Sequence, residues 1–426
     1  MTPRRTTSRT TARPTAHTTA RPAARPATRL AGGLAAVLAA SGVVVLGTAV
    51  APADAAALRV PRHATLVFHG RGYGHGRGMS QYGAEGAARK GLSGQQIVHF
   101  YYPHTQSGTT QGKVRVLISS DDQDTTVVNR SGLKVHDLDN GRTFAVPTSG
   151  KIAKATRWRM SSKPGKPAEV SYLTGSWHVW RTLAGDGEFR AAKPIRLVLP
   201  SGPTAYRGVL QSRTSTRGGS SPHRITVNKL SLEDYVRAVV PSEAFPSWHP
   251  AALGAQAIAA RSFAAYKRGH PRSTLYDVYD TSTDQAYAGV AAEYPTTDRA
   301  TAKTAGRIRT YQGDPALTEF SSSNGGWTVA SSLPYQVAKQ DPYDGWSGNP
   351  NHTWTTTLSD AAVEKAWPTV GNLQKISVLQ RDGHGRWNGR VEQIELVGSQ
   401  GSKTLTGDDF RVGLGLRSTW FDISVR

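Results

Sequence analysis

Cysteine is absent from this 426-residue sequence, so it can hold no disulfide, no thiolate metal site and no cysteine nucleophile. A chain without disulfides depends on its packed core for stability, and a chain of this length can supply one. Acidic residues are also scarce, because 30 Asp and Glu stand against 52 Lys and Arg and leave a net charge of +22. A charge of that size favours polyanionic partners.

The N-terminal region also lacks acidic residues, with none in the first 30 positions, which are rich in Thr, Arg, Pro and Ala. An apolar run of small residues follows at 31–51, and Ala53-Asp54-Ala55 offers a cleavage site. This order predicts a secretory signal over residues 1–57 and a protein outside the cytoplasmic membrane. An uncleaved N-terminal anchor is the alternative, because about 20 apolar residues can span a bilayer.

Removal of the signal would change the charge only in part. Residues 1–57 carry seven Arg and one Asp, so the remaining chain would keep +16 of the +22. Nucleic acid is not expected as a partner, because no aromatic-basic motif of a DNA- or RNA-binding module is present. Anionic polymers of a cell wall are the better candidates for a secreted protein.

Glycine and proline are abundant, at 44 and 24 residues, which predicts many turns and short strands rather than a helical bundle. Patterns such as those at 114–118 and 195–199 predict strands. A region rich in such patterns, 113–228, separates a glycine-rich segment at 58–112 from residues 229–426. We therefore predict an α+β fold, rich in strands, with residues 113–228 as an inserted region.

A central pair of Ala-rich helices is predicted within the last of these regions. Ser231 is the expected N-cap of the first helix, which should run to about Val240 and stop at Pro241. The second helix should start with Pro250 and end near residues 267–269. Glu243 lies between them in an apolar turn bounded by prolines. Poor solvation there would raise its pKa and suit it to donate a proton near neutral pH. A surface glutamate near a helix end is the alternative.

Six segments, taken together, resemble the SpoIID/LytB family. They are residues 72–84, 232–243, 252–264, 284–289, 322–327 and 415–421. The resemblance implies a SpoIID-like fold and a cell-wall protein, either a peptidoglycan lytic transglycosylase or a non-catalytic enhancer of a wall amidase. A sporulation or septal scaffold is a further alternative. The family's catalytic glutamate falls on Glu243, and no cofactor is implied.

The order of the segments departs from the family pattern and indicates a circular permutation. The Gly-His-Gly segment usually follows the strand that here lies at 420–423, whereas in this chain it comes first. Residues 64–104 are therefore expected to complete a catalytic domain at 229–426. The strand at 65–68 should then pair near 420–423, with the glycine-rich loop close to Glu243. The zinc site of some members uses cysteines and cannot be carried over, so no metal is expected.

A lytic transglycosylase needs one carboxyl group, which protonates the glycosidic oxygen between MurNAc and GlcNAc and then deprotonates the MurNAc C6 hydroxyl. The product is a 1,6-anhydro ring. Glycosidases that use water usually employ two carboxylates. The nearby Glu233 and Asp234 lie in the first turn of a helix, where capping and interaction with the helix dipole are expected instead.

Eight further residues are candidates for binding the glycan strand through hydrogen bonds or stacking. They are His75, Gln81, Gln256, Arg261, Tyr287, Ser322, Ser323 and Asn324. Structural alternatives stay open for several of them. Arg261 could bond a loop, 322–324 could be ordinary turn residues, and His75 could bond backbone in a tight loop rather than a metal or a sugar.

Overall fold

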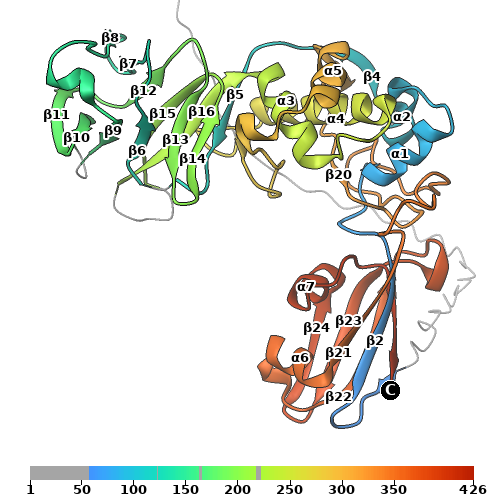
Figure 1. The fold of residues 1–426 in the computed structure, drawn as a ribbon. Coiled ribbons are helices and arrows are strands. Elements are labelled where there is room, and N and C mark those ends of the chain that lie inside the picture. The colour runs from blue at the N-terminus through green and yellow to red at the C-terminus, as the bar shows by residue number, and fades with distance from the viewer. Residues whose placement is uncertain (1–56, 122, 163–165, 217–221) are drawn as a thin grey trace, which may run out of the picture. The chain divides into compact units, whose positions relative to one another are not determined.

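A strand-rich α+β fold, as predicted, is formed by the residues that the computed structural model describes, 57–121, 123–162, 166–216 and 222–426 (Figure 1). The predicted secretory signal and its anchor alternative fall on residues 1–57, almost wholly outside these ranges, and stay predictions. Among the described helices, none is long and apolar enough to cross a membrane.

The predicted β-rich region supplies every strand except β17 (Val278–Tyr279) to two sheets that share one buried core around Trp158, Phe189 and Leu197. The six-stranded sheet has the order β11 (Ser176–Thr182), β10 (Glu169–Thr174), β9 (Arg157–Ser161), β6 (Thr125–Val128), β13 (Ile195–Leu199) and β14 (Gly202–Tyr206). The seven-stranded sheet has the order β17 (Val278–Tyr279), β5 (Lys113–Leu117), β16 (His223–Ser231), β15 (Val209–Ser215), β12 (Gly187–Arg190), β7 (Lys134–Asp137) and β8 (Thr143–Ala145). A short 3-10 helix, η1 (Lys151–Lys154), lies between β8 and β9 in the chain.

Helix α4 (Pro250–Gly269) is the centre of the helical part, as its alanine content predicts. It packs against α1 (Gln81–Arg89), α2 (Gly94–Tyr101), α3 (Leu232–Glu243) and α5 (Pro295–Lys303). Its alanines are divided between two buried cores, because Ala257 and Ala260 belong to one and Ala255 and Ala259 to the other. Short strands accompany these helices: β4 (Gln106–Thr109), β18 (Arg307–Tyr311), β19 (Asp314–Pro315), β3 (Met79–Ser80), β20 (Phe320–Ser321), with the 3-10 helix η3 (Gly289–Ala292).

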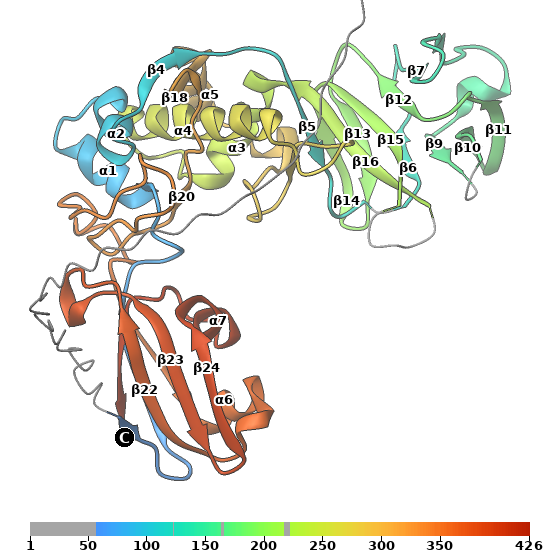
Figure 2. The same ribbon diagram turned by 180° about the vertical axis from the view of Figure 1, so that it is seen from behind.

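The expected pairing of the first and last segments is confirmed. Strand β2 (Thr65–Arg71) lies between β21 (Thr353–Ser359) and β25 (Phe421–Val425), with Phe68 opposite Ile423 and Gly70 opposite Phe421. Figure 2 shows this three-stranded sheet from behind, with the N-terminal strand β2 among strands from the C-terminal part of the chain. The neighbouring elements are β1 (Leu58–Arg59), β22 (Leu373–Arg381), β23 (Val391–Gly398), β24 (Gly401–Thr406), α6 (Asp360–Ala366), α7 (Gly407–Gly413), η4 (Pro368–Val370) and η5 (Arg386–Asn388).

The predicted end of the first central helix is wrong by three residues. Helix α3 passes through Pro241 and ends at Glu243, so the glutamate occupies the last turn of the helix rather than a loop after it. The turn closes because the backbone N–H of Ala244 donates to the Val240 carbonyl at 2.9 Å, and the Ser242 hydroxyl donates to the Ala238 carbonyl. Proline therefore costs one backbone hydrogen bond here without ending the helix.

Candidate active site

The carboxyl group of Glu243 is held by two neutral donors from other parts of the chain. Its Oε1 accepts a hydrogen bond from the backbone N–H of Ala286 at 2.7 Å, and its Oε2 accepts one from Gln81 Nε2 at 3.2 Å. The same Gln81 nitrogen also lies 2.9 Å from the Glu243 carbonyl oxygen. Segments 162 and 43 residues away along the chain thus meet at one carboxyl group.

The environment of this carboxyl raises its pKa. Burial disfavours the charged form and is the largest influence, whereas the hydrogen bonds from Ala286 and Gln81 lower the pKa and offset part of the rise. Glu243 forms no ion pair among the described residues, and burial, Ala286 and Gln81 are the influences on its pKa. A carboxyl group in this state can hold a proton closer to neutral pH than an ordinary glutamate can.

Gln81 reaches Glu243 because the glycine-rich loop places the start of α1. Ser80 is the N-cap of α1, and its hydroxyl accepts from the Gly83 N–H at 2.9 Å. Gly78 precedes it with φ of +63°, and a side chain there would approach the Glu319 carbonyl oxygen to 2.1 Å. The prediction that the permuted segment lies beside Glu243 is therefore confirmed, with Gln81 as the residue that makes contact.

An aromatic cluster that includes the sequence neighbours of Gln81 and Glu243 was missed by the sequence analysis. Tyr82, Phe245 and Trp248 contact one another edge to face, with ring centroids 5.1–6.3 Å apart. Tyr82 also lies 6.4 Å from the ring of Trp346, and the Phe245 side chain is 56% exposed. We call these four residues the aromatic wall. They come from three distant segments, and only the pair Phe245 and Trp248, next to Glu243 in sequence, offered a local hint.

Arg261 requires a correction, because it is fully buried and does not face a substrate. Its guanidinium forms a two-point ion pair with Glu233, with both N–O distances at 2.8 Å, and donates to the backbone carbonyls of Ala257, Thr301 and Arg307. The structural alternative is therefore the correct one, and this arginine ties α4 to α3.

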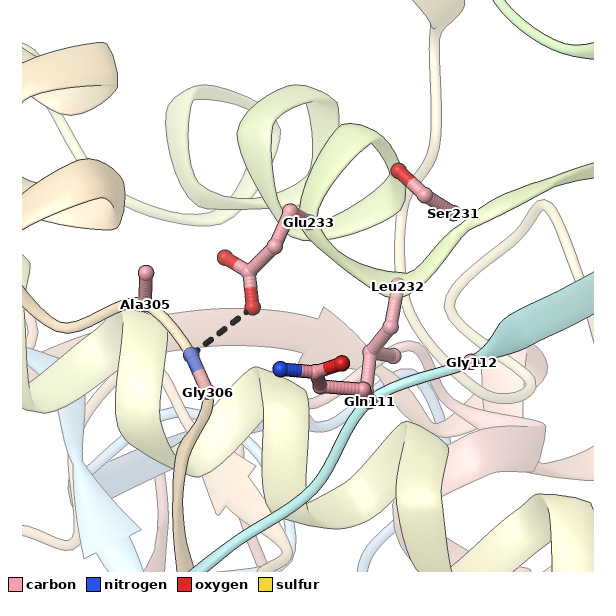
Figure 3. A pocket seen from close by; sticks show the side chains of 7 residues that line it. All are labelled: Gln111, Gly112, Ser231, Leu232, Glu233, Ala305 and Gly306. Carbon is pink, nitrogen blue, oxygen red and sulfur yellow. Dashed lines mark hydrogen bonds between the residues drawn. The ribbon is translucent and has the colours of Figure 1, made fainter.

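Glu233 does more than the expected capping. It lines a cavity of about 340 Å³ at the N-terminal end of α3. Figure 3 shows its carboxylate turned toward the Gly306 N–H, from which Oε1 accepts a hydrogen bond at 2.9 Å. Asp234 behaves as predicted, since its N–H donates to the Ser231 hydroxyl and its carboxylate accepts from that hydroxyl. The cavity in Figure 3 is thus lined by a carboxylate that is already paired, at the end of α3 opposite to Glu243.

Tyr287, Ser323 and Asn324 are likewise corrected, because all three are buried among protein partners. The Tyr287 hydroxyl donates to Asn228 Oδ1 at 2.7 Å. Ser323 donates to both oxygens of Asp344 at 2.9 Å, and Asn324 Nδ2 donates to the carboxylate of Asp341 at 2.7 Å. These residues support the site rather than line it.

The two buried aspartates also support α1. Asp344 accepts from the Ser80 hydroxyl at 2.6 Å and lies 2.7 Å from His352 Nδ1. Asp341 accepts from Tyr101 at 2.7 Å. Because Ser80 directly precedes Gln81, this network fixes the residue that contacts Glu243. Ser322 is half-buried, accepts from Asn351 Nδ2 at 3.1 Å and stays a candidate for substrate contact.

His75 makes the backbone hydrogen bond that its loop position suggests. Its Nδ1 accepts from the Arg77 N–H at 3.0 Å, which leaves Nε2–H as a donor in the neutral ring. Burial, reinforced by Arg77, lowers its pKa to about 4. His75 lines a cavity of about 220 Å³ together with Lys267, Asp284 and Glu319. It stays a candidate donor, and within the described residues no group of three or more His, Asp or Glu side chains could hold a metal ion.

Gln256 is buried in α4 with an unusual feature. Neither its amide oxygen nor its amide nitrogen has a hydrogen-bond partner among the described residues. A buried amide without partners is costly, so a water molecule or a ligand would satisfy it. This residue stays a candidate for substrate contact.

The comparisons with known proteins match the segment that holds this site. Residues 221–311 match the family model described as SpoIID, Stage II sporulation protein. The amidase enhancer of Bacillus subtilis (strain 168) is 38% identical over 135 residues, which cover 30% of this chain and 17% of that protein. Stage II sporulation protein D is 32% identical over 226 residues in B. subtilis and 31% over 222 residues in Bacillus amyloliquefaciens. Each covers 46% of this chain and 61% of the relative, so the chain spans less than two thirds of each of these three proteins.

Proposed function

We propose that this chain, which belongs to the SpoIID/LytB family, acts on the cell wall as a peptidoglycan lytic transglycosylase with Glu243 as its single acid and base. The observation that carries the proposal is the half-buried Glu243 carboxyl, which has a raised pKa and two neutral donors. An exposed aromatic residue, Phe245, follows two residues later in the chain. The predicted secretory signal favours action outside the cytoplasmic membrane.

The proposed reaction needs no water. Protonated Glu243 gives its proton to the GlcNAc oxygen as the bond from MurNAc C1 to that oxygen breaks. The carboxylate formed is stabilised by the Ala286 N–H and by Gln81 Nε2, which are already in place. It then takes the proton of the MurNAc C6 hydroxyl while O6 bonds to C1, which closes the 1,6-anhydro ring and returns Glu243 to its protonated form.

The surroundings favour this one-carboxyl mechanism over hydrolysis with two carboxylates. Glu233 is committed to Arg261, and the Asp234 carboxylate accepts a hydrogen bond from the hydroxyl of Ser231, the N-cap of α3. Asp280 also has a pKa raised by burial, but its Oδ1 accepts from both the backbone N–H and the hydroxyl of Ser119. We propose that the aromatic wall stacks against sugar rings, since aromatic faces suit the apolar faces of pyranoses.

The alternative function is stimulation of a separate wall amidase, which the name of one relative favours. The transglycosylase and enhancer functions are distinguished by incubating the purified protein with isolated sacculi, with and without an amidase. The products are then identified by mass spectrometry. The proposal predicts soluble glycan fragments that end in 1,6-anhydro-MurNAc. Faster release of stem peptides in the presence of the amidase, without any anhydro product, would support the enhancer instead.

A further inference from the structure

A cavity of about 580 Å³ lies on the three-stranded sheet β21-β2-β25, beside η5. Its lining includes His69, Arg71, Thr355, Arg386, Trp387 and Asp422. None of these residues belongs to the aromatic wall or to the hydrogen bonds of Glu243. The volume falls within the roughly 300–1,000 Å³ that ligand sites occupy. We call it the sheet groove.

One row of polar side chains crosses the floor of the sheet groove. His69 is opposite Thr355 on one neighbouring strand and opposite Asp422 on the other, so the three side chains share one face of the sheet. His69 Nδ1 lies 3.3 Å from the Thr355 hydroxyl. An imidazole, a hydroxyl and a carboxylate in a row supply the mixed donors and acceptors that sugar hydroxyls require.

Trp387 stands at the edge of the sheet groove in a backbone conformation that aromatic residues rarely adopt. Its φ is 59° and its ψ is 25°, and the next residue, Asn388, also has a φ of 59°. Glycine would be the favoured residue at such a position, and strained backbone of this kind is concentrated at binding sites. The indole is half-buried, so it combines a fixed orientation with an accessible ring.

Two guanidinium groups give the sheet groove a positive charge. Arg386 is exposed and lies 4.9 Å from the centre of the Trp387 ring. Arg71 donates to the Gly325 carbonyl at 2.8 Å and contacts His352 at 2.5 Å. Neither arginine appears among the ion pairs of the described residues, whereas Asp422 lies 3.7 Å from a third arginine, Arg381. Arg71 also lies over the Trp420 ring at 5.3 Å, so the exposed Arg386 is the guanidinium that an anionic group on the ligand would meet.

We propose that the sheet groove is a non-catalytic binding site for an acidic amino-sugar glycan strand. One sugar ring stacks on Trp387, its hydroxyls meet the row at His69, and a carboxylate lies against Arg386. The site would hold the wall polymer independently of the chemistry at Glu243. The proposal therefore does not depend on whether that glutamate cleaves glycans.

The test measures binding by calorimetry in the Glu243→Gln background, so that no cleavage intervenes. The probe is a soluble, peptide-free tetrasaccharide of alternating GlcNAc and MurNAc. Trp387→Gly removes the ring and suits the positive φ, so thermal unfolding should occur at the same or a higher temperature while affinity falls at least about tenfold. Arg386→Ala should weaken binding of this probe more than binding of a neutral GlcNAc tetramer.

The matched control is Val412→Ala on α7, which trims a side chain that is 67% exposed and lies outside the sheet groove. It should leave affinity unchanged. Equal affinity in folded Trp387→Gly protein would overturn the proposal, as would binding of a glycerol-phosphate polymer in place of the tetrasaccharide. Trp387-dependent binding by a protein that cleaves no glycan would instead reject only the transglycosylase function.

Discussion

At the residue scale, the protonation of Glu243 is set by opposing influences that can be changed one at a time. Burial raises its pKa, and the donors Ala286 and Gln81 lower it. The Ala286 donor is a backbone group, which a side-chain substitution cannot delete. Gln81 can be replaced, so it is the residue through which the acid can be tuned.

Gln81→Leu should shift the pH dependence of glycan cleavage. The substitution removes a donor to the charged carboxylate, so the Glu243 pKa should rise further and the alkaline limb of the rate profile should move to higher pH. The hydrogen bonds formed by charged groups contribute about 1.5–3 kcal/mol, so we expect a loss of roughly tenfold or more in kcat. A lower rate with an unmoved alkaline limb would show that Gln81 does not tune Glu243.

Glu243→Gln should make the protein more stable at neutral pH. The pKa of Glu243 is higher in the folded state than in the unfolded state, so binding a proton at this carboxyl stabilises the fold. This contribution to the free energy of unfolding is fully present below the unfolded-state pKa and is lost as pH rises through the folded-state pKa. Glutamine does not ionise and escapes that loss. Thermal unfolding of the variant should occur above that of the wild type at pH 7, and the two should converge below about pH 4, near the ordinary glutamate pKa. A gap that widens on acidification would contradict the raised pKa.

At the scale of elements, the site depends on where α1 begins and α3 ends, because Gln81 and Glu243 lie at those two positions. The sequence predicted the bounds of α4, because Pro250 suits a first helical turn and basic residues with Gly269 suit the last. Helix α2 has an equally regular start, because Ser93 and Gln96 form a capping box there. The sequence placed the end of α3 too early, because the rule that proline ends a helix does not hold in a final turn whose closing bond comes from Ala244.

The contacts that define the site could not be read from sequence patterns. The ion pair between Arg261 and Glu233 joins positions 28 residues apart, and the aromatic wall joins Tyr82 to Trp346. Periodicity reports which face of an element is buried and not which distant residue it meets. The neighbourhood of Gln81 and Glu243 was predicted only because the family resemblance supplied the missing spatial order.

Gly78→Ala should damage α1 placement, and Gly91→Ala is its matched control. Both glycines flank α1 with positive φ, +63° and +88°, so both substitutions incur about 1–2 kcal/mol of backbone strain. Only at Gly78 would the new methyl group meet a backbone atom, the Glu319 carbonyl oxygen at 2.1 Å, whereas nothing lies within 4 Å at Gly91. Urea unfolding should show the larger loss for Gly78→Ala, accompanied by loss of glycan cleavage. Equal losses would mean that the loop relaxes freely.

At the scale of the whole molecule, two features matter: the net positive charge and the order of the segments along the chain. The chain after residue 57 carries a net charge of +16 by sequence. Its last residue, Arg426, exchanges backbone hydrogen bonds with Thr65 at 2.9 and 3.1 Å, so the C-terminal end lies beside the first strand of the permuted segment. This closure explains how the segment can come first in sequence and still complete the site.

Binding to isolated sacculi should weaken as salt rises. Electrostatic attraction between a basic protein and an anionic wall is screened over about 10 Å at 0.1 M salt and about 3 Å at 1 M. A sedimentation assay should show less bound protein at 1 M than at 0.05 M sodium chloride, with a smaller effect on sacculi stripped of anionic polymers. Equal binding at all salt concentrations in this range would show that electrostatic attraction does not contribute to wall binding.

The most direct test of the central claim compares Glu243→Gln with Asp280→Asn on purified sacculi. Both residues are partly buried carboxyls with raised pKa values, and the variants differ in which acid is lost. With Glu243 as the single acid and base, Glu243→Gln should release no 1,6-anhydro-MurNAc product detectable by mass spectrometry, while Asp280→Asn, if folded, retains substantial release. Anhydro product from Glu243→Gln at the wild-type rate would contradict the account.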